Sequence, residues 1–285
     1  MRLASFALSG RSSWGVVVDD GVIDMGRGLA ANFPSLRAVL GAEALGEVAE
    51  FARRTKPDYP LSGVTLLPPV PEPEKIICLG NNYRAHVLEA GGKVPEHPQI
   101  FIRLANTLVG HEGELVVPSI SCELDYEVEL AVVIGRAGRH VPVARALEHV
   151  AGYTCFHDAS VRDIQFQHSL AAGKNFFATG PCGPWIVTRD EIPDPGRLTV
   201  KTRLNGREMQ NGNTSDLIFD VPTVVAYVSS FTPLAPGDII ATGTPQGVGF
   251  TRKPPIWLKP GDVVEIEVEN IGVLRNRVVA ERDAR

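Results

Sequence analysis

The chain has 285 residues, of which 44% are hydrophobic, and its formal net charge at pH 7 is -5. A chain of this length and composition can build one large globular domain, or a large domain with a small companion. The acidic balance and the scattered Lys and Arg residues argue against a nucleic-acid-binding protein, because no basic block is present to neutralise phosphates.

Cysteine usage and the N-terminal sequence predict a cytoplasmic protein with reduced thiols. The four cysteines have no CxxC spacing and lie in apolar surroundings, which is not the pattern of a disulfide framework. The first residues contain too short an apolar part for a signal peptide, and no window approaches the roughly 18 apolar residues of a membrane helix. We therefore expect a soluble protein with no membrane partner.

Residues 1–69 predict a small N-terminal α/β domain. Alternating apolar and polar residues in RLASFAL and WGVVVDDGVIDM predict a hairpin. Apolar residues at helical spacing in PSLRAVLGAEALGEVAEFARR predict one helix, which begins at Pro34 and ends near Arg54. The proline-dense stretch 66–75 predicts an extended connection to a catalytic domain over residues 70–285.

The rest of the chain predicts a mostly β architecture of the α+β class. Short apolar runs such as KIICLG, PQIFIRL, YEVELAVVIG and LTVKTRLNG are bounded by Gly, Pro and Asn, which is typical of an antiparallel, β-rich body. Two helices are expected to interrupt it, at about 143–149 and about 220–230. The segment GTPQGVG at 243–249 lacks the GxxxxGK[ST] order of a phosphate loop, so we expect a turn-rich loop there.

Three acids occupy alternate positions in the sequence CELDYEVEL, at Asp125, Glu127 and Glu129. Successive strand side chains point to opposite faces, so these three share one face while Val128 and Leu130 share the other. Two interpretations are open. The acids can form a solvent-facing strand face, which is the commoner origin of such alternation. They can also surround a cation, since carboxylates buried without a partner must be protonated or carry a large energetic cost.

A further acid, Asp158, ends the apolar run GYTCF and is followed by Arg162 and Gln165 at helical spacing. At the start of a helix, Asp158 can act as an N-cap. It can also supply another ligand oxygen. A site made only of oxygen ligands selects Mg²⁺, Mn²⁺ or Ca²⁺ rather than Zn²⁺, which usually takes His or Cys, and Mg²⁺ or Mn²⁺ fits best.

Five motifs, in order, carry a resemblance to a known family. They are GNNYRAH with HVLEA, LDYEVELAVVIG, HDASVRDIQ, AAGKNFF and ATGTPQGVG, and their order and spacing resemble those of the fumarylacetoacetate hydrolase family over about residues 75–280. The resemblance implies a mixed β-sandwich roll, with the first 69 residues as the small N-terminal domain that some members carry. It also implies a homodimer.

The resemblance further implies a set of site residues. They are the metal ligands Glu127, Glu129 and Asp158, the substrate-orienting Arg162 and Gln165, the carboxylate-binding Thr244, the active-site Lys174, and His86 with Glu89 as a water-activating pair on a mobile segment. Asp125 falls outside the ligand positions, so we expect a group behind the ligands or on the surface.

Chemistry supports these roles independently. One helical turn brings Glu89 to His86, where a carboxylate can orient the imidazole and raise its basicity. A partly buried Lys174 beside a metal can stabilise a developing oxyanion. The alternatives are a surface His86, a solvated Lys174, a helix-surface Arg162 and a loop-capping Thr244.

Two departures from the family pattern concern the neighbourhood of Lys174. Many relatives read GKSFDTF where this chain reads GKNFFAT, so Phe177, Ala178 and Thr179 replace Asp, Thr and Phe, and His157 stands where Asn is usual. We expect these changes to leave the metal ligands intact and to alter the pocket wall. The resemblance therefore does not fix the substrate.

The predicted function is metal-dependent hydrolysis of a carbon–carbon bond in a 2,4-diketo acid, either an acylpyruvate or a 2,4-diketo-3-deoxy sugar acid. Water activated by His86 would attack the distal carbonyl, and the metal and Lys174 would hold the leaving enolate of pyruvate or a substituted pyruvate. An oxaloacetate-type decarboxylase or keto–enol isomerase is the alternative on the same scaffold. A non-catalytic, metal-stabilised binding protein is the second alternative.

Overall fold

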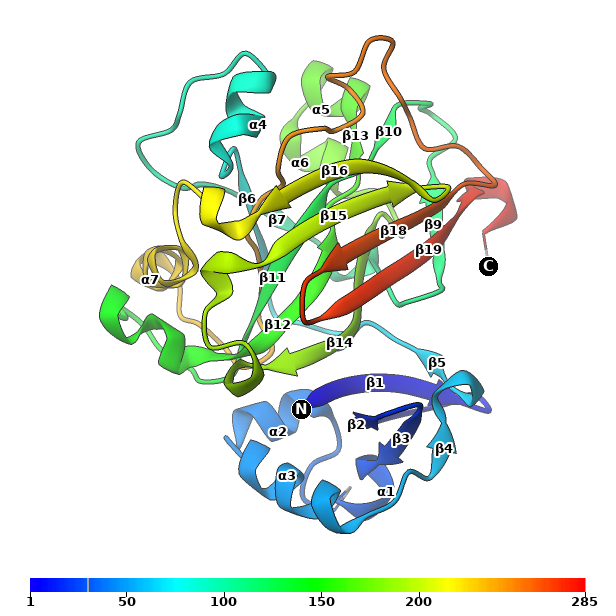
Figure 1. Ribbon diagram of the computed structural model, residues 1–285, viewed down its shortest axis with the longest axis vertical. Coiled ribbons are helices and arrows are strands. Elements are labelled where there is room, and N and C mark those ends of the chain that lie inside the picture. Colours follow the sequence, from blue (N-terminus) through cyan, green and yellow to red (C-terminus); the bar gives the residue numbers. More distant parts are fainter. Residues whose placement is uncertain (30, 285) are drawn as a thin grey trace.

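The computed structural model describes residues 1–29 and 31–284. Its main feature is a 12-stranded sheet in the order β4-β3-β2-β1-β14-β12-β11-β17-β6-β7, with β5 paired to β1 and β8 to β14. A second sheet of five strands, in the order β16-β15-β18-β19-β9, packs over β11, β12 and β14, and β10 and β13 form a separate two-stranded ladder (Figure 1). The expected mostly β architecture of the α+β class is confirmed.

The N-terminal part contains the elements β1 (Arg2–Leu8), β2 (Arg11–Val18), β3 (Gly21–Asp24), α1 (Met25–Gly28), α2 (Leu36–Gly41), α3 (Leu45–Arg54), β4 (Tyr59–Pro60), η1 (Leu61–Gly63) and β5 (Thr65–Leu66). The remaining strands are β6 (Ile76–Gly80), β7 (Gln99–Arg103), β8 (Leu108–Val109), β9 (Glu114–Val117), β10 (Leu124–Asp125), β11 (Val128–Ile134), β12 (Val150–His157), β13 (Ser160–Val161), β14 (Gly180–Thr188), β15 (Thr199–Leu204), β16 (Arg207–Asn213), β17 (Ile239–Ala241), β18 (Val263–Val268) and β19 (Gly272–Ala280). Their helices are α4 (Arg84–Glu89), α5 (Arg162–Gln167), α6 (Leu170–Lys174), α7 (Val221–Phe231) and the short 3₁₀ turns η2 (Ala105–Thr107), η3 (Val143–His149), η4 (Arg189–Glu191), η5 (Pro195–Arg197), η6 (Thr214–Asp216) and η7 (Glu281–Asp283).

The predicted single helix between Pro34 and Arg54 is wrong. The structure has two helices, α2 and α3, separated by three residues. Glu43 lies in this break with a φ of 52°, a left-handed conformation that ends a right-handed helix. The helix expected at about 220–230 is confirmed as α7, the one at about 143–149 is the 3₁₀ turn η3, and residues 243–249 form a loop as predicted.

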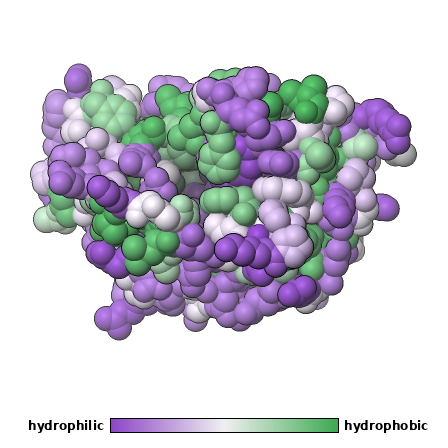
Figure 2. All heavy atoms as spheres, turned by 90° about the horizontal axis from the view of Figure 1, so that it is seen from above, coloured by the Kyte–Doolittle hydropathy of each residue, from purple (hydrophilic) through white to green (hydrophobic). Residues whose placement is uncertain are grey.

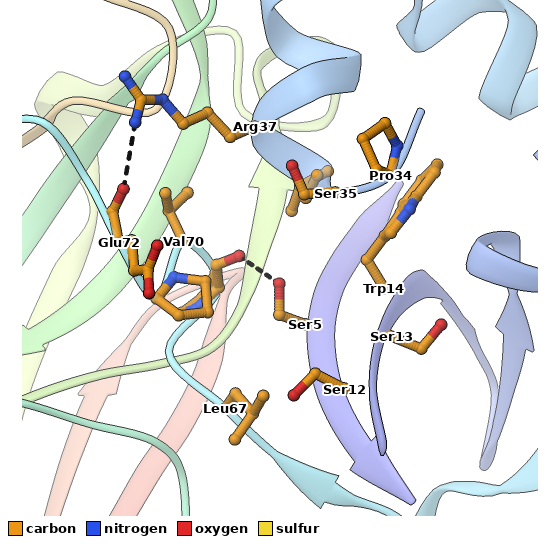
Figure 3. A pocket seen from close by; sticks show the side chains of 13 residues that line it. Ser5, Ser12, Ser13, Trp14, Pro34, Ser35, Arg37, Leu67, Val70 and Glu72 are labelled. Atoms are coloured by element: carbon orange, nitrogen blue, oxygen red, sulfur yellow. Dashed lines mark hydrogen bonds between the residues drawn. The ribbon is translucent and has the colours of Figure 1, made fainter. Parts of the chain in front are cut away.

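The N-terminal part joins the main sheet through β1, which pairs with β14 at Arg2 and Leu3. At the seam, the Ser5 hydroxyl donates to the carbonyl of Pro69 at 2.7 Å, and Arg37 donates to the carbonyl of Glu72 at 3.4 Å (Figure 3). A cavity of about 470 Å³ lies beside these contacts. The proposed division at residues 69 and 70 stays a prediction.

The core between the two large sheets buries one face of β11, and the side chains that alternate with these core residues lie on the other face of the strand. Val128 and Leu130 are fully buried in this core together with Ile266 and Leu274 from the five-stranded sheet. Glu129, between them in sequence, therefore points to the other face of β11.

All four cysteines are free thiols, as predicted. Within residues 1–29 and 31–284, no helix is both long enough and apolar enough to cross a membrane.

Asn82 ties the start of α4 to two other segments. Its side-chain amide donates to the carbonyls of Phe219 at 3.0 Å and Thr242 at 2.8 Å, and its side-chain oxygen accepts from the backbone N–H of Phe219 at 2.9 Å. Asn82 is 1% exposed, so water cannot replace these bonds. The base of α4 is thereby held in place while the helix itself lies at the surface (Figure 1).

We predict that Asn82→Ala lowers the free energy of unfolding by about 2–4 kcal/mol, because it leaves the buried Thr242 carbonyl and the half-buried backbone groups of Phe219 without these partners. Urea denaturation measures this loss. Asn211→Ala is the matched control: Asn211 is exposed and its amide bonds only the exposed Glu208, so its effect should stay within about 0.5 kcal/mol. Equal losses in the two variants would contradict the anchoring role of Asn82.

Candidate metal and active site

Three carboxylates meet where two neighbouring strands end. Glu129 belongs to β11, Glu127 comes just before β11, and Asp158 follows β12, its antiparallel neighbour. Each offers one oxygen, and these oxygens all lie within 4.8 Å of one another. All three residues are at most 4% exposed, so the solvent-facing interpretation of the alternating acids is wrong. The structure brings the three predicted ligands together.

Asp158 does not cap a helix. Ser160 and Val161 pair with β10 before the chain turns into α5 at Arg162, and the residue at the N-cap position is Val161. This pairing keeps the chain extended where the sequence suggested a helix start. The side chain of Asp158 instead accepts hydrogen bonds from two buried cations, Arg103 and Lys174.

Lys174, the last residue of α6, contacts two of the carboxylates. Its ammonium donates to Glu127 at 2.8 Å and to Asp158 at 2.5 Å, and the side chain is 4% exposed. Burial disfavours the charged lysine, but Asp158 and Glu127 outweigh this cost and raise the pKa of Lys174. Lys174 is therefore a buried ammonium at the carboxylate cluster, and the solvated alternative is wrong.

Arg162 connects Glu127 to a fourth acid. Its guanidinium donates to Asp125 at 2.9 Å, to Glu127 at 2.5 Å and to the side-chain oxygen of Gln165 at 3.0 Å. Asp125 is fully buried and also accepts from the backbone N–H groups of the loop at Gly249 and Phe250. Asp125 thus lies behind the ligand group and is not a surface residue. Because these protein groups already bind the guanidinium, the substrate role of Arg162 stays a prediction.

A further buried cation, Arg103 on β7, is not among the residues predicted from the sequence. This arginine is 2% exposed, and it donates to the Asp158 carboxylate at 2.6 Å, to the Ala159 carbonyl at 3.1 Å and to the Thr179 hydroxyl at 2.8 Å. The sequence PQIFIRL contains one indication that Arg103 is buried, which is the alternation of residues along a strand. In a strand with Phe101 facing inward, Arg103 shares the inward face, and the apolar Ile102 between them is 58% exposed.

The buried charges of the cluster do not balance. The carboxylates are those of Asp125, Glu127, Glu129 and Asp158, and the cations are those of Arg103, Arg162 and Lys174. Within residues 1–29 and 31–284, four negative groups against three positive groups leave one excess negative charge, and Glu129 accepts a hydrogen bond only from the backbone N–H of Gly243, at 2.8 Å. Burial and the nearby Asp158 and Glu127 raise the pKa of Glu129 well above its usual range.

This donor set fits a divalent cation. Three carboxylate oxygens in a buried position match the preference of Mg²⁺ and Mn²⁺ for oxygen ligands. A divalent ion would change the local excess from one negative to one positive charge, which favours ionised Glu129 and attracts an anionic substrate. The observation that indicates such an ion is that, among the described residues, Glu129 has no Lys, Arg or His ion-pair partner and accepts from the backbone N–H of Gly243.

His86 and Glu89 lie on α4, above the cluster. His86 is 7% exposed, and its Nδ1 is buried without a hydrogen-bond partner, 3.8 Å from the Glu89 carboxylate. Both oxygens of Glu89 accept from the backbone N–H of Gly247, at 3.0 and 3.2 Å. Glu89 therefore docks α4 on the 243–249 loop, and the expected orienting hydrogen bond to His86 is not formed in this conformation.

A cavity of about 150 Å³ is lined by nearly all of the site residues predicted from the sequence. Its walls include His86, Glu127, Glu129, Asp158, Arg162, Gln165, Lys174 and Thr244, which are all the predicted site residues except Glu89. Figure 2 views the molecule from the side of α4 and α5 and shows hydrophobic and hydrophilic side chains intermixed around a hollow in this face. The larger seam cavity at the N-terminal part includes none of these residues.

The departures from the family pattern do not reach this cavity, which corrects our expectation of an altered pocket wall. Phe177 is 57% exposed, Ala178 has a φ of 53°, and Thr179 binds Arg103. His157 is fully buried on the strand β12, where burial and the nearby Arg103 lower its pKa to about 3. None of these four residues is among those that line the cavity.

Comparison of the sequence and the structure with those of known proteins identifies the family of this chain. The family model described as fumarylacetoacetate (FAA) hydrolase, C-terminal, matches residues 75–279. The chain belongs to the fumarylacetoacetate hydrolase family. The resemblance seen in the sequence motifs is thereby confirmed, and the N-terminal β1–β5 region lies outside the match.

Three relatives cover most of the chain. The human protein named oxaloacetate tautomerase FAHD2A, mitochondrial, is 46% identical over 226 residues, which are 78% of this chain and 72% of that protein. The crystal structure of 5-carboxymethyl-2-hydroxymuconate delta-isomerase from Mycobacterium smegmatis is 35% identical, with a TM-score of 0.78 and 99% of each chain covered. That of maleylpyruvate hydrolase from Sphingobium sp. SYK-6, in complex with manganese(II) and pyruvate, is 33% identical, with a TM-score of 0.82 and coverage of 98% and 99%. These comparisons support an enzyme.

We predict that Glu129→Gln abolishes stabilisation by Mn²⁺. At 100 times its dissociation constant, a ligand raises the free energy of unfolding by about 2.7 kcal/mol. Because protons compete with the ion for a carboxylate of raised pKa, this gain should be larger at pH 8 than at pH 6 in the unsubstituted protein. Thermal unfolding with and without Mn²⁺ measures it, and the exposed Glu47→Gln is the control. An unchanged Mn²⁺ effect in Glu129→Gln would remove Glu129 from the ligand set.

We also predict that Arg103→Met lowers the free energy of unfolding by about 3–5 kcal/mol, because it leaves the carboxylate of Asp158 buried with one cation fewer. Arg136→Met breaks the exposed ion pair with Glu43 and should cost at most about 1 kcal/mol. Urea denaturation of both variants in the presence of EDTA makes the comparison. A similar small cost for both would show that Arg103 is not needed to compensate the cluster.

Proposed function

We propose that this protein catalyses the keto–enol tautomerisation of a short 2-oxo acid of the oxaloacetate type, with Mg²⁺ or Mn²⁺ held by Glu127, Glu129 and Asp158. The observation that carries the proposal is the pairing of an imidazole and a buried ammonium, His86 and Lys174, in the walls of one small cavity. Tautomerisation requires one group that moves a proton at carbon 3 and one that stabilises negative charge on the 2-oxygen.

The size of the cavity favours a compact substrate. Sites for drug-sized ligands have volumes of roughly 300–1,000 Å³, whereas this cavity has about 150 Å³. The charge balance favours an acid, because a divalent ion at the cluster leaves one excess positive charge for a carboxylate to neutralise. A four-carbon 2-oxo acid meets both conditions.

The residues of this chain can perform the proton transfer as follows. His86 accepts a proton from carbon 3, the C–H electron pair forms the double bond between carbons 2 and 3, and the carbonyl π pair moves onto the 2-oxygen. The ammonium of Lys174 exchanges its hydrogen bond to the Asp158 backbone carbonyl, 3.2 Å long, for one to this developing oxyanion. The carboxylates of Glu127 and Asp158 keep the lysine protonated throughout. The imidazolium of His86 then gives the proton to the oxygen, which completes the enol and restores the neutral base.

The bound cation supplies Lewis-acid stabilisation of negative charge on the substrate oxygens. The relatives support this chemistry, since one is named an oxaloacetate tautomerase, one an isomerase, and one was crystallised with manganese and the 2-oxo acid pyruvate. The pocket of this chain supplies the residues for the same class of acid.

Hydrolysis of a 2,4-diketo acid, the function first predicted, is the second candidate. The specific observation in its favour is Glu89, 3.8 Å from His86, which would orient the imidazole to activate water after a small movement of α4. The relation to maleylpyruvate hydrolase also supports it. Tautomerisation is preferred because the more similar human relative is named for it and because it needs no attacking water.

Two expectations stay predictions. The homodimer awaits a measurement of mass in solution, and the exposed apolar Ile102, Leu104 and Phe177 are candidates for its interface. The cytoplasmic location also stays a prediction, and the human relative carries the word mitochondrial in its name.

We predict that His86→Ala reduces tautomerisation of oxaloacetate by about 10²- to 10⁴-fold, the usual contribution of a general base. Loss of enol absorbance in the ultraviolet and deuterium exchange at carbon 3 measure the rate in Mg²⁺ or Mn²⁺. Oxaloacetate decarboxylation, which needs no base at carbon 3, should stay within several-fold, and the exposed His97→Ala should keep both activities.

Two results would contradict this assignment. Full tautomerase activity in His86→Ala would remove His86 as the base. If the unsubstituted protein accelerates acylpyruvate hydrolysis but not the tautomerisation of oxaloacetate, the second candidate replaces the first.

A further inference from the structure

We propose that Asn81 and Gln99 form an amide pair that binds an oxygen at the distal end of the substrate, and so selects four-carbon 2-oxo acids whose carbon 4 is a carboxylate carbon or carries a hydroxyl group. Both residues line the same cavity as His86 and Lys174, but they lie at its exposed rim rather than in the charged cluster. The inference rests on the proposed function and names the part of the substrate that the cluster does not hold.

The ends of two strands bring the pair together. Gly80, the last residue of β6, pairs with Gln99, the first residue of β7, and Asn81 follows directly. The side-chain amide of Asn81 donates to the side-chain oxygen of Gln99 at 2.7 Å. Asn81 has a φ of 55°, a left-handed conformation that Asn adopts more readily than most residues.

The neighbouring residue fixes this position. Asn82 makes three side-chain hydrogen bonds to Phe219 and Thr242, so the backbone that carries Asn81 cannot shift freely. The strand pairing of Gln99 fixes the other partner. The pair is therefore preorganised, which reduces the entropic cost of binding a ligand.

The hydrogen bond between the two amides leaves matched groups unused. Each amide has one carbonyl oxygen and one NH₂ group. Whichever amide donates, the pair retains a free NH₂ group on one residue and a free carbonyl oxygen on the other. The NH₂ group can donate to a carboxylate, and the two groups together can donate to and accept from a hydroxyl.

The cations of the cavity cannot perform this role. Of the Lys and Arg side chains that line it, Lys174 serves the 2-oxygen in the proposed reaction, and Arg162 is bonded to the buried carboxylates of Asp125 and Glu127. The remaining walls near β6 and β7 are the apolar Leu79, Ile100 and Phe101. A polar group at the far end of the substrate would therefore meet the amide pair as its hydrogen-bond partner.

A matched series of four-carbon acids tests the proposal. Oxaloacetate, 4-hydroxy-2-oxobutanoate and 2-oxobutanoate differ only in the group at carbon 4, which is a carboxylate, a hydroxymethyl carbon and a methyl group. Their dissociation constants are measured by calorimetry in Mg²⁺ for the unsubstituted protein and for Gln99→Leu, which keeps the size of the side chain. We expect Gln99→Leu to weaken binding of at least one oxygen-bearing acid roughly tenfold, the usual effect of one lost hydrogen bond. Binding of 2-oxobutanoate should change less than about twofold.

The acids whose binding is weakened by Gln99→Leu identify the substrate group that the amide pair binds. Weakening of oxaloacetate alone assigns a carboxylate, weakening of the hydroxy acid alone assigns a hydroxyl, and weakening of both assigns a shared oxygen subsite. Equal weakening of all three acids, or of none, would overturn the proposal. Gln167→Leu, an exposed glutamine at the end of α5, is the control and should leave all three constants unchanged.

Two further readouts separate this proposal from its alternatives. If the pair only clips β6 to β7, Gln99→Leu will lower the melting temperature and leave the ratio of the dissociation constants unchanged, which overturns the proposal. Binding does not require turnover, so a protein that binds the acids in the expected order but shows no deuterium exchange at carbon 3 would contradict the proposed tautomerase and leave the amide pair supported.

Discussion

The burial of four carboxylates against three cations is the constraint on which this site depends. In a low-dielectric interior, an unpaired carboxylate must be protonated or gain a partner. Three of the acids have arginine or lysine partners, and Glu129 has only a backbone N–H. This unpaired group makes the cluster a cation site, and the same imbalance makes the cluster receptive to an anionic substrate once the ion is present.

The fold serves this cluster by placing it at one end of strands that are otherwise apolar on both faces, since Ala131 and Val133, on the same face of β11 as Glu129, are also buried in hydrophobic clusters. One face of β11 and β12 is buried in the core between the sheets, and the opposite face presents Glu129 beside the strand ends that carry Glu127 and Asp158. Helix α4 contributes His86 to the cavity wall, Glu89 docks the helix on Gly247, and Asn82 anchors its base. A rigid charged floor beside a surface helix that carries His86 is the arrangement that the proposed proton transfer requires.

Much of the site was predictable because its signals are local in sequence. Alternation in CELDYEVEL predicted acids on one face of a strand, and the ordered motifs indicated Lys174 and His86. What the sequence could not show is contact at long range. Arg103 lies 55 positions from Asp158, and nothing near either residue indicates the pair. The prediction of one continuous helix over residues 34–54 failed for the opposite reason. A single residue in the left-handed conformation, Glu43, interrupts a sequence with helical periodicity.

The central claim is that a single divalent cation completes the carboxylate cluster, and anomalous diffraction tests it most directly. Crystals grown with Mn²⁺ and measured at the manganese absorption edge would show where the ion binds in each chain. The account predicts one strong anomalous peak bounded by oxygens of Glu127, Glu129 and Asp158, with Lys174 still bonded to the cluster. A fully loaded crystal with no peak between these three residues, or with its peak elsewhere, would contradict it.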